Sequence, residues 1–352
     1  CSICLFAMPY SPALWIAASL LWILDAANNV AMEPYRAYVS DRLDSRQQGA
    51  GFLTQSAFTG LAQTLAYLAP TLLVQAGVSA DLIDANGIPE ITRIAFLIGA
   101  VLSISTILYS VLRVPELPLE SEDRQRMTME RLTVRAAVDD FVAALRDMPR
   151  PMRQLAVAML FQWFGMFAYW QYIAFALGRS LFATADAGSA SFRQAVLLTG
   201  QAGALYNFVA FLAAFAMMPI VRGIGAKPVH AGAMLLAGLA MLSLSMVTGK
   251  AGLVPAMIGI GIGWASLMGN PYVMLAGAVP PERTGVYMGI FNMFIVVPMM
   301  IETLVMPIIY RPLLGGDPRN VLVLSGAMML MAAIGTLRVR EGETGARPAG
   351  AT

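Results

Sequence analysis

The sequence predicts an all-α membrane protein, and three observations support this fold class. Hydrophobic residues make up 58% of the 352 positions and charged residues only 12%, well below the roughly 25% of an average soluble domain. A soluble fold of this length has too little interior to bury so much apolar surface. The apolar residues also form long unbroken stretches without the alternation of barrel strands. Helices are then expected, because lipid offers no partners for unpaired backbone groups.

Nine stretches are long enough to cross a bilayer, which takes about 20 residues in a helix. They cover approximately residues 12–35, 52–76, 92–112, 154–177, 195–221, 229–248, 252–276, 284–309 and 320–338. Cys1 to Met8 form only half of an apolar span and lack the charged segment and cleavage site of a signal peptide. We therefore expect the chain to begin near the end of a further span.

The longest connection, residues 113–153, carries eight Arg and eight Asp or Glu residues. This composition predicts a solvated linker between a partial N-terminal helical region (1–112) and a six-helix C-terminal region (154–340). Apolar residues recur at helical spacing over 132–145, so we expect an amphipathic helix there, either at the membrane interface or in solvent. Residues 341–352 are expected to form a disordered tail.

Basic residues predict the orientation, because Lys and Arg are enriched in cytoplasmic loops. The loops around 36–50, 113–153, 222–228 and 278–283, together with the C-terminal tail, hold 17 of the 23 Lys and Arg residues. The alternate loops hold the other six. This bias places the linker and the C-terminus in the cytoplasm, and we expect an integral protein of a bacterial inner membrane.

An internal repeat indicates the overall architecture. A shift of 237 residues superposes Pro34-Tyr35 on Pro271-Tyr272, and Pro70 on Pro307. Six spans follow the linker, whereas only three and a fragment precede it, so about 80 further residues are expected upstream. Two six-helix halves joined by a long charged linker are the architecture of the major facilitators. The nine stretches would be spans 4–12 of twelve.

Asp25 lies near the middle of the first full stretch, and ionisable residues at membrane depth are functional candidates by default. It shares one face of its helix with Asn29, Glu33 and Arg36. Proton coupling is the function that we favour for Asp25, with a structural hydrogen bond or a pair with an upstream helix as alternatives. Glu33 and Arg36 can also pair with each other, and Pro34 is expected to disrupt the helix there.

Further polar and aromatic residues lie within the later stretches. Amides and indole rings suit a sugar, which has hydroxyl groups at its edges and C–H groups on its faces, although a single amide also bridges helices. These residues are Gln162, Trp163, Trp170, Gln171, Tyr206, Asn207, Trp264, Asn270 and Asn292. For Glu302 we expect binding of substrate or of a proton, with a snorkelling side chain or an interhelical pair as the alternative. The run Gly259–Gly263 predicts close helix packing, and Gly269-Asn270-Pro271 predicts a break.

The sequence favours no cofactor, no metal site and no enzyme. Cys1 and Cys4 have C-x-x-C spacing but lie in an apolar run, and His230 is the one histidine, so zinc and haem chemistry lack ligands. A net charge of +2 does not suggest nucleic acid as a partner.

The residues around Asp25 resemble a known family. Leu24-Asp25-Ala-Ala-Asn28-Asn29, with Pro34-Tyr-Arg36-Ala37 and Asp41, is similar to the fourth-helix signature of sucrose and maltose proton symporters. These belong to the glycoside–pentoside–hexuronide branch of the major facilitators. Pro271-Tyr272 and Gly285-Val-Tyr-Met-Gly289-Ile-Phe-Asn292-Met-Phe-Ile-Val-Val-Pro298 resemble later parts of that family. Asn270, Met299 and Glu302 depart from its pattern.

The resemblance implies a monomeric transporter in the lipid bilayer that carries a disaccharide or related glycoside with a proton, Asp25 being the coupling carboxyl. The expected substrate path comprises Asn28, Asn29, Glu33, Arg36, Gln162, Trp163, Asn207, Asn270, Asn292 and Glu302. The expected cytoplasmic gate comprises Asp41, Arg42, Glu282 and Arg283, with solvated loop charges as the alternative. Other hypotheses are a facilitator for a drug or organic ion, a sensor that kept the fold, an inactive fragment, and a membrane enzyme.

Overall fold

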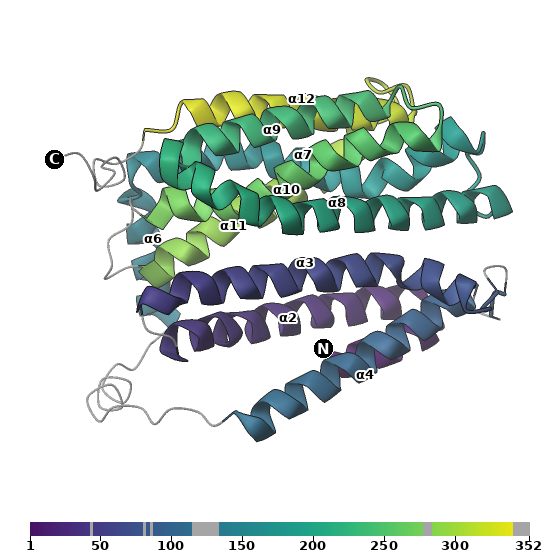
Figure 1. The fold of residues 1–352 in the computed structure, drawn as a ribbon, viewed down its shortest axis with the longest axis horizontal. Coiled ribbons are helices and arrows are strands. Elements are labelled where there is room, and N and C mark those ends of the chain that lie inside the picture. Colours follow the sequence, from purple (N-terminus) through teal and green to yellow (C-terminus); the bar gives the residue numbers. More distant parts are fainter. Residues whose placement is uncertain (43–44, 80–81, 85–86, 115–133, 277–283, 341–352) are drawn as a thin grey trace. The chain divides into compact units, whose positions relative to one another are not determined.

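The computed structural model describes residues 1–42, 45–79, 82–84, 87–114, 134–276 and 284–340 (Figure 1). In these segments the fold is all-helical, and the one extended pairing that they contain is an isolated bridge between Ile83 and Pro89. The predicted all-α fold class is confirmed. The chain divides into two compact units. Unit 1 comprises Cys1–Thr59 and Leu65–Arg131, and unit 2 comprises Gly60–Thr64 and Leu132–Thr352.

The described residues of unit 1 form four helices and a short 3-10 turn. The elements are α1 (Ser2–Ala7), η1 (Met8–Tyr10), α2 (Leu14–Arg42), α3 (Ser45–Gln75, of which Gly60–Thr64 belong to unit 2) and α4 (Glu90–Arg113). α1 packs against α4, and the Ser2 hydroxyl donates to the Ser103 hydroxyl at 3.0 Å. Cys4 and Ala100 are buried, so Cys4 is a packing residue of α1.

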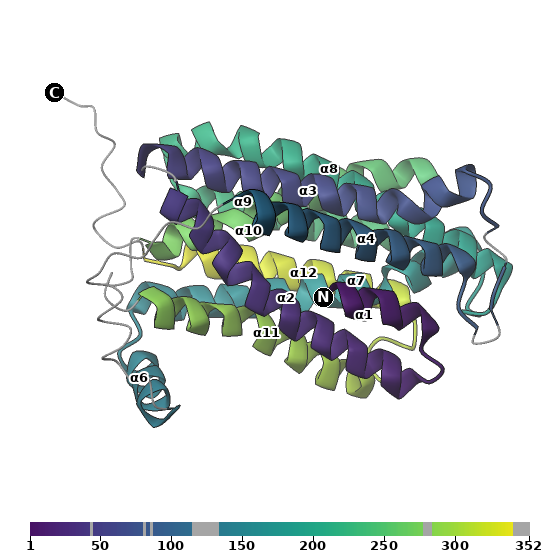
Figure 2. The same ribbon diagram turned by 90° about the horizontal axis from the view of Figure 1, so that it is seen from below.

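The described residues of unit 2 form six long helices and a shorter one. They are α6 (Val134–Arg146), α7 (Arg150–Leu181), α8 (Ala190–Ile224), α9 (Ala226–Leu244), α10 (Leu253–Ala276), α11 (Thr284–Ile309) and α12 (Pro318–Leu337), with the 3-10 turn η2 (Lys250–Gly252) before α10. α6 covers residues 134–145 of the segment 132–145 for which the sequence predicts an amphipathic helix, and residues 132–133 lie outside the described residues. It lies beside the first turns of α11, where the Tyr287 hydroxyl donates to the Asp147 carbonyl (Figure 2).

Side-chain caps and one glycine define helix ends in unit 2. The Ser189 hydroxyl accepts from the backbone N–H of Phe192 at the start of α8, and the Asp317 carboxylate accepts from that of Arg319 at the start of α12. Such caps satisfy N–H groups that lack partners in the first helical turn. Gly225 separates α8 from α9 with a φ of 88°, a conformation that side chains disfavour.

Each of the nine predicted stretches is helical in the residues described here. Six segments of this part of the chain are long and apolar enough to cross a membrane: Glu90–Arg113, Ala190–Ile224, Ala226–Leu244, Lys250–Leu275, Gly289–Ile309 and Pro318–Leu337. α2, α3 and α7 have 29, 31 and 32 residues, which also exceeds the roughly 20 needed to span a bilayer. α7 carries Gln162 and Gln171 within its length, which lowers its apolar character.

The glycine run of α10 produces the close packing that it predicts. A Cβ atom on Gly259 would lie 2.6 Å from Ala240 Cβ, and one on Gly263 would lie 2.5 Å from Ala237 Cβ. Both positions face α9. Gly261 faces α8, where an added Cβ would meet a backbone oxygen at 2.6 Å. Small residues therefore allow α10 to approach both neighbouring helices at backbone distance.

Two further helix pairs in unit 2 meet in the same way. A Cβ on Gly238 of α9 would lie 2.9 Å from the Gly326 carbonyl oxygen of α12, and a Cβ on Gly326 would lie 2.8 Å from the Gly238 carbonyl oxygen. A Cβ on Gly165 of α7 would lie 2.8 Å from the Ser325 carbonyl oxygen of α12. α12 thus packs tightly against both α7 and α9.

The expected helix breaks at two prolines were wrong. α2 continues through Pro34 to Arg42, and α10 continues through Pro271 to Ala276. A proline removes one hydrogen bond from the helix interior. Membrane helices tolerate this loss when neighbouring helices, side chains or local adjustments satisfy the freed carbonyl.

Candidate functional site

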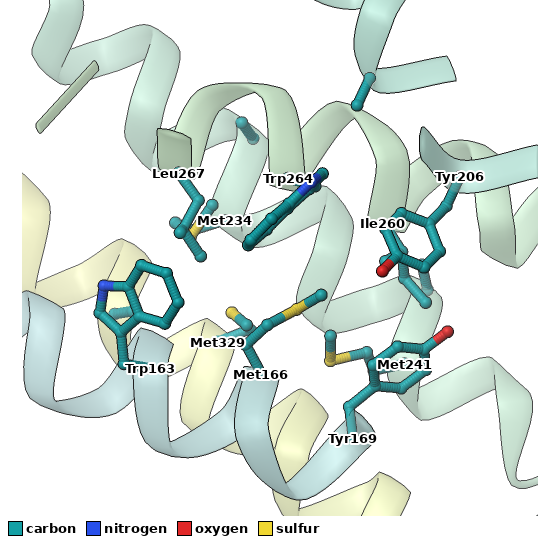
Figure 3. Packing of buried hydrophobic residues seen from close by; sticks show 14 of the residues in the cluster. Trp163, Met166, Tyr169, Tyr206, Met234, Met241, Ile260, Trp264, Leu267 and Met329 are labelled. Carbon is teal, nitrogen blue, oxygen red and sulfur yellow. The ribbon is translucent and has the colours of Figure 1, made fainter. Parts of the chain in front are cut away.

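Three tryptophans form an aromatic cluster inside unit 2. Trp163 and Trp170 come from α7 and Trp264 from α10, and their ring centroids are 5.3 to 6.5 Å apart in edge-to-face arrangements. This geometry places the positive ring edge against the negative ring face. Trp163 and Trp264 are buried. Figure 3 shows Met166, Met234 and Met329 around these two indoles.

The indole N–H groups of the aromatic cluster differ in their hydrogen bonding. Trp170 Nε1 donates to the Tyr206 hydroxyl of α8 at 3.2 Å. The Tyr206 ring lies 6.4 Å from that of Tyr169 (Figure 3). Trp163 Nε1 is buried and has no hydrogen-bond partner among the described residues. A buried donor without a partner costs about 1–3 kcal/mol, so Trp163 offers an unused donor to a bound group.

A buried polar network links three helices of unit 2 next to the aromatic cluster. His230 of α9 bonds through Nδ1 to the Ser266 hydroxyl at 2.9 Å and through Nε2 to Gln162 Oε1 at 3.0 Å. Asn270 Nδ2 donates to the Ser266 hydroxyl at 2.7 Å. All four side chains are buried. Gln162 comes from α7 and Ser266 and Asn270 from α10, so the network joins helices far apart in the sequence.

The hydrogen bonds of this network form a chain in which each group donates to the next, from Asn270 to Gln162. Because Asn270 donates to the Ser266 oxygen, the Ser266 hydroxyl proton can point to His230 Nδ1. The neutral imidazole then carries its proton on Nε2 and donates to Gln162 Oε1. Gln162 Nε2 is left buried without a partner in the described part of the chain. Adjacent residues of α7, Gln162 and Trp163, therefore each hold a buried N–H group that no described residue accepts.

A buried carboxyl group lies on the neighbouring helix. Glu302 of α11 is fully buried, and its Oε2 accepts from Gln171 Nε2 of α7 at 2.8 Å. Its Oε1 is also buried and has no partner among the residues that the structure describes. Gln171 follows Trp170 directly in the sequence, so α7 positions residues of the aromatic cluster and the partner of Glu302.

An ionic cluster joins α7 and α12 at the end of unit 2 away from α6. The Asp317 carboxylate bonds to the Arg319 guanidinium at 2.6 Å and lies 3.6 Å from Arg179 Nη1 of α7. The hydrogen bonds from Arg319 hold the pKa of Asp317 below its ordinary value. Tyr310, near both Arg179 and Asp317, has a raised pKa because of burial. This cluster ties the start of α12 to the end of α7.

The profile of the Major Facilitator Superfamily matches residues 1–301 of this chain. The chain belongs to the major facilitator superfamily. Its family and fold are those of membrane transporters. The match identifies the superfamily and does not assign the chain to the narrower branch of sugar symporters.

A solved structure shows the same fold. A bacterial homologue of the human lysosomal transporter Spinster, in an inward-facing and occupied conformation, superposes with a TM-score of 0.55 and 15% sequence identity. The match covers 99% of this chain and 83% of that chain. At this identity the likeness shows the facilitator fold alone. No curated protein matches the sequence.

The structure brings some of the sequence-predicted residues together. Gln162 and Asn270 share the buried polar network, Trp163 belongs to the aromatic cluster, and Glu302 pairs with Gln171. The sequence analysis gave no role to His230 or Ser266, which connect Gln162 to Asn270. His230 and Ser266 are both polar residues within apolar stretches, and this feature of the sequence could have marked them as candidates.

Other predicted residues do not join these groups. Asn207 donates to the Gly203 carbonyl of its own helix at 2.9 Å, and the Asn292 side chain is exposed on α11. In unit 1, the side chains of Asp25 and Asn28 are exposed on α2.

The remaining predicted residues lie outside the described side chains. Those on α2 are Asn29, Glu33, Arg36, Asp41 and Arg42, and those between α10 and α11 are Glu282 and Arg283.

Proposed function

We propose that this facilitator is a secondary active transporter that carries a glycoside, of the disaccharide class, together with a proton. Alternating access would move the solute, and coupling would arise because the protonated, loaded protein and the empty protein favour different facing states. The proposed arrangement retains the predicted orientation, with residues 113–153 as the linker and the C-terminus in the cytoplasm, and a single chain as the transporting unit.

The observation that carries this proposal is the pair of unused buried donors beside the aromatic cluster. Gln162 Nε2 and Trp163 Nε1 are buried without partners in the described residues. The rings of Trp170 and Trp264 lie 5.3 Å apart next to them. A sugar hydroxyl can accept a hydrogen bond from an amide or indole N–H, and its C–H face can pack on an aromatic ring. Both kinds of contact are thus available within unit 2.

Asp25 is the proposed coupling carboxyl of unit 1. It lies on α2 within the apolar segment Leu14–Asn28, where a permanent charge is costly. A carboxyl group that takes up a proton with the solute removes this charge and lowers the cost of reorienting the loaded protein. The resemblance of residues 24–41 to sugar symporters supports the same role.

The test follows proton entry into vesicles that contain the reconstituted protein. Sucrose, maltose or melibiose is added outside, and an internal pH-sensitive dye reports the response. We expect sugar-induced acidification that is lost in Asp25→Asn and retained in Glu90→Gln, a control change at the first residue of α4. No proton movement with any of these sugars, from protein shown to be folded, would reject sugar–proton symport.

A further inference from the structure

Glu302 is a fully buried carboxyl group whose environment does not match its charge. Its Oε2 accepts one hydrogen bond, from the uncharged amide of Gln171 at 2.8 Å. Its Oε1 is buried and has no partner in the described residues. A carboxylate has acceptor sites on both oxygens, and in a protein interior these are normally filled or matched by a cation. As an acid, Glu302 would lose the uncompensated charge while keeping the bond from Gln171.

We propose that Glu302 binds and releases a proton during transport, as a titrating carboxyl of unit 2 distinct from Asp25. The role in coupling rests on the proposed function, whereas proton binding at Glu302 does not. The proton would reside on Oε1, the oxygen that Gln171 leaves free.

In the part of the chain that the structure describes, no ion pair joins Glu302 to a Lys or Arg side chain. From α7, Tyr172 lies close enough to Glu302 for an electrostatic interaction, and Arg179 lies farther along the same helix. At the start of α12, Asp317 engages both Arg179 and Arg319, so these two positive charges already face a carboxylate.

The charged residues of α6 lie toward the opposite end of α11. That helix packs near Tyr287, 15 residues before Glu302, which corresponds to about 22 Å of helix. The charged groups at this end include Asp139, Asp140 and Arg146 of α6, Asp147 after it, and Arg150 and Arg153 at the start of α7. None of them is placed to neutralise Glu302.

Two tyrosines connect Glu302 with the ionic cluster at the end of unit 2. The rings of Tyr172 and Tyr310 lie 5.3 Å apart, and Tyr310 interacts electrostatically with Arg179 and Asp317. A phenol hydroxyl both donates and accepts a hydrogen bond, so it can pass a proton between water and a carboxyl group. Neither Tyr172 nor Tyr310 supplies a positive charge that could balance an ionised Glu302.

The first experiment needs no solute. Infrared spectra of the purified protein are recorded across a pH titration, and the C=O stretch of protonated carboxyl groups is followed. We expect a titrating band that disappears in Glu302→Gln and persists in Glu90→Gln. A wild-type band unchanged by Glu302→Gln would overturn the proposal.

A second measurement on the wild-type protein removes the dependence on a folded variant. Dicyclohexylcarbodiimide modifies protonated carboxyl groups in apolar surroundings, and peptide mapping by mass spectrometry locates the label. We expect labelling of Glu302 that declines as the pH rises. Absence of label at Glu302 over the whole pH range would contradict proton binding there.

A transport experiment tests the coupling role. In vesicles, Glu302→Gln is expected to lose proton-driven accumulation of the sugar but to retain exchange of labelled for unlabelled sugar, because exchange requires no release of the proton. Retention of accumulation would overturn the coupling role. If Glu302→Gln lost sugar binding itself, Glu302 would be a solute ligand instead. The same would follow if the wild-type protein transported an organic cation and Glu302→Gln abolished that transport. A protein that titrates at Glu302 but moves no sugar would reject the proposed function alone.

Discussion

His230 of α9 and Gln162 of α7 are joined by a 3.0 Å hydrogen bond between the imidazole Nε2 and the amide Oε1. The other ring nitrogen of His230 bonds to Ser266 of α10. A single buried side chain therefore links three helices in the interior of unit 2. This arrangement makes the histidine a structural element of the site, since it fixes the orientation of the Gln162 amide.

His230→Ala should destabilise the protein by about 2–4 kcal/mol, because it removes the partner of Gln162 Oε1, takes one of two hydrogen bonds from Ser266 and opens a cavity. His230→Asn should recover part of this loss, since an amide can reach one of the partners. Thermal unfolding in detergent measures both variants. Equal stability of His230→Ala and the wild type would show that the network does not hold the helices together.

Gly263→Ala should destabilise unit 2 by about 1–3 kcal/mol, because the new Cβ would lie 2.5 Å from Ala237 Cβ. Gly269→Ala is the matched control on the same helix, where an added Cβ meets no atom within 4 Å. That control should be neutral or stabilising, as alanine favours helix by up to about 1 kcal/mol over glycine. The unfolding temperature of Gly263→Ala should therefore be clearly lower than that of Gly269→Ala. Similar values for the two variants would contradict the close contact of α9 and α10.

Asp317 should make stability depend on pH. Its folded-state pKa is lowered, so its stabilising contribution is present above its unfolded pKa and is lost as the pH falls through the folded value. Asp317→Asn should therefore reduce the difference in unfolding temperature between pH 7 and pH 3 while keeping an N-cap. Asp317→Ala also removes the cap, which costs about 1 kcal/mol more. An undiminished pH dependence in Asp317→Asn would assign the effect to other carboxyl groups.

Trp163→Phe should show whether the Trp163 side chain binds the solute or only packs against its neighbours. The change keeps an aromatic ring and removes the buried Nε1–H that has no partner in the described residues. If the donor serves the solute, we expect sugar affinity to fall about 3- to 10-fold, the value of one neutral hydrogen bond, while the cavity left by the smaller ring lowers the stability modestly. Binding and thermal unfolding are measured on the same preparation. Unchanged affinity would mean that the N–H group serves no ligand.

Composition and apolar length were sufficient to predict the helical membrane fold, because lipid leaves the backbone few alternatives. The glycine run of α10 also predicted a real close contact, since few other reasons place glycines at this spacing in a helix. The breaks at Pro34 and Pro271 were wrong, because membrane surroundings let a helix continue past a lost hydrogen bond.

The partners inside the candidate site could not be predicted from the sequence. Glu302 bonds to Gln171, which is 131 positions away, and only the packing of α7 against α11 brings the two together. The same holds for His230, whose two partners lie on two other helices. Helical spacing reports which residues share a face, but it does not report which face of another helix comes opposite.

The mutual approach of Gly238 and Gly326 has a mechanical consequence. Helices that are separated by large side chains can slide when those side chains change rotamer, whereas α9 and α12 meet through backbone atoms that have no such freedom. We therefore expect α7, α9, α10 and α12 to keep their mutual register while the protein works, and to move as one block. During a transport cycle, the helices that move would then be those that contact their neighbours through longer side chains.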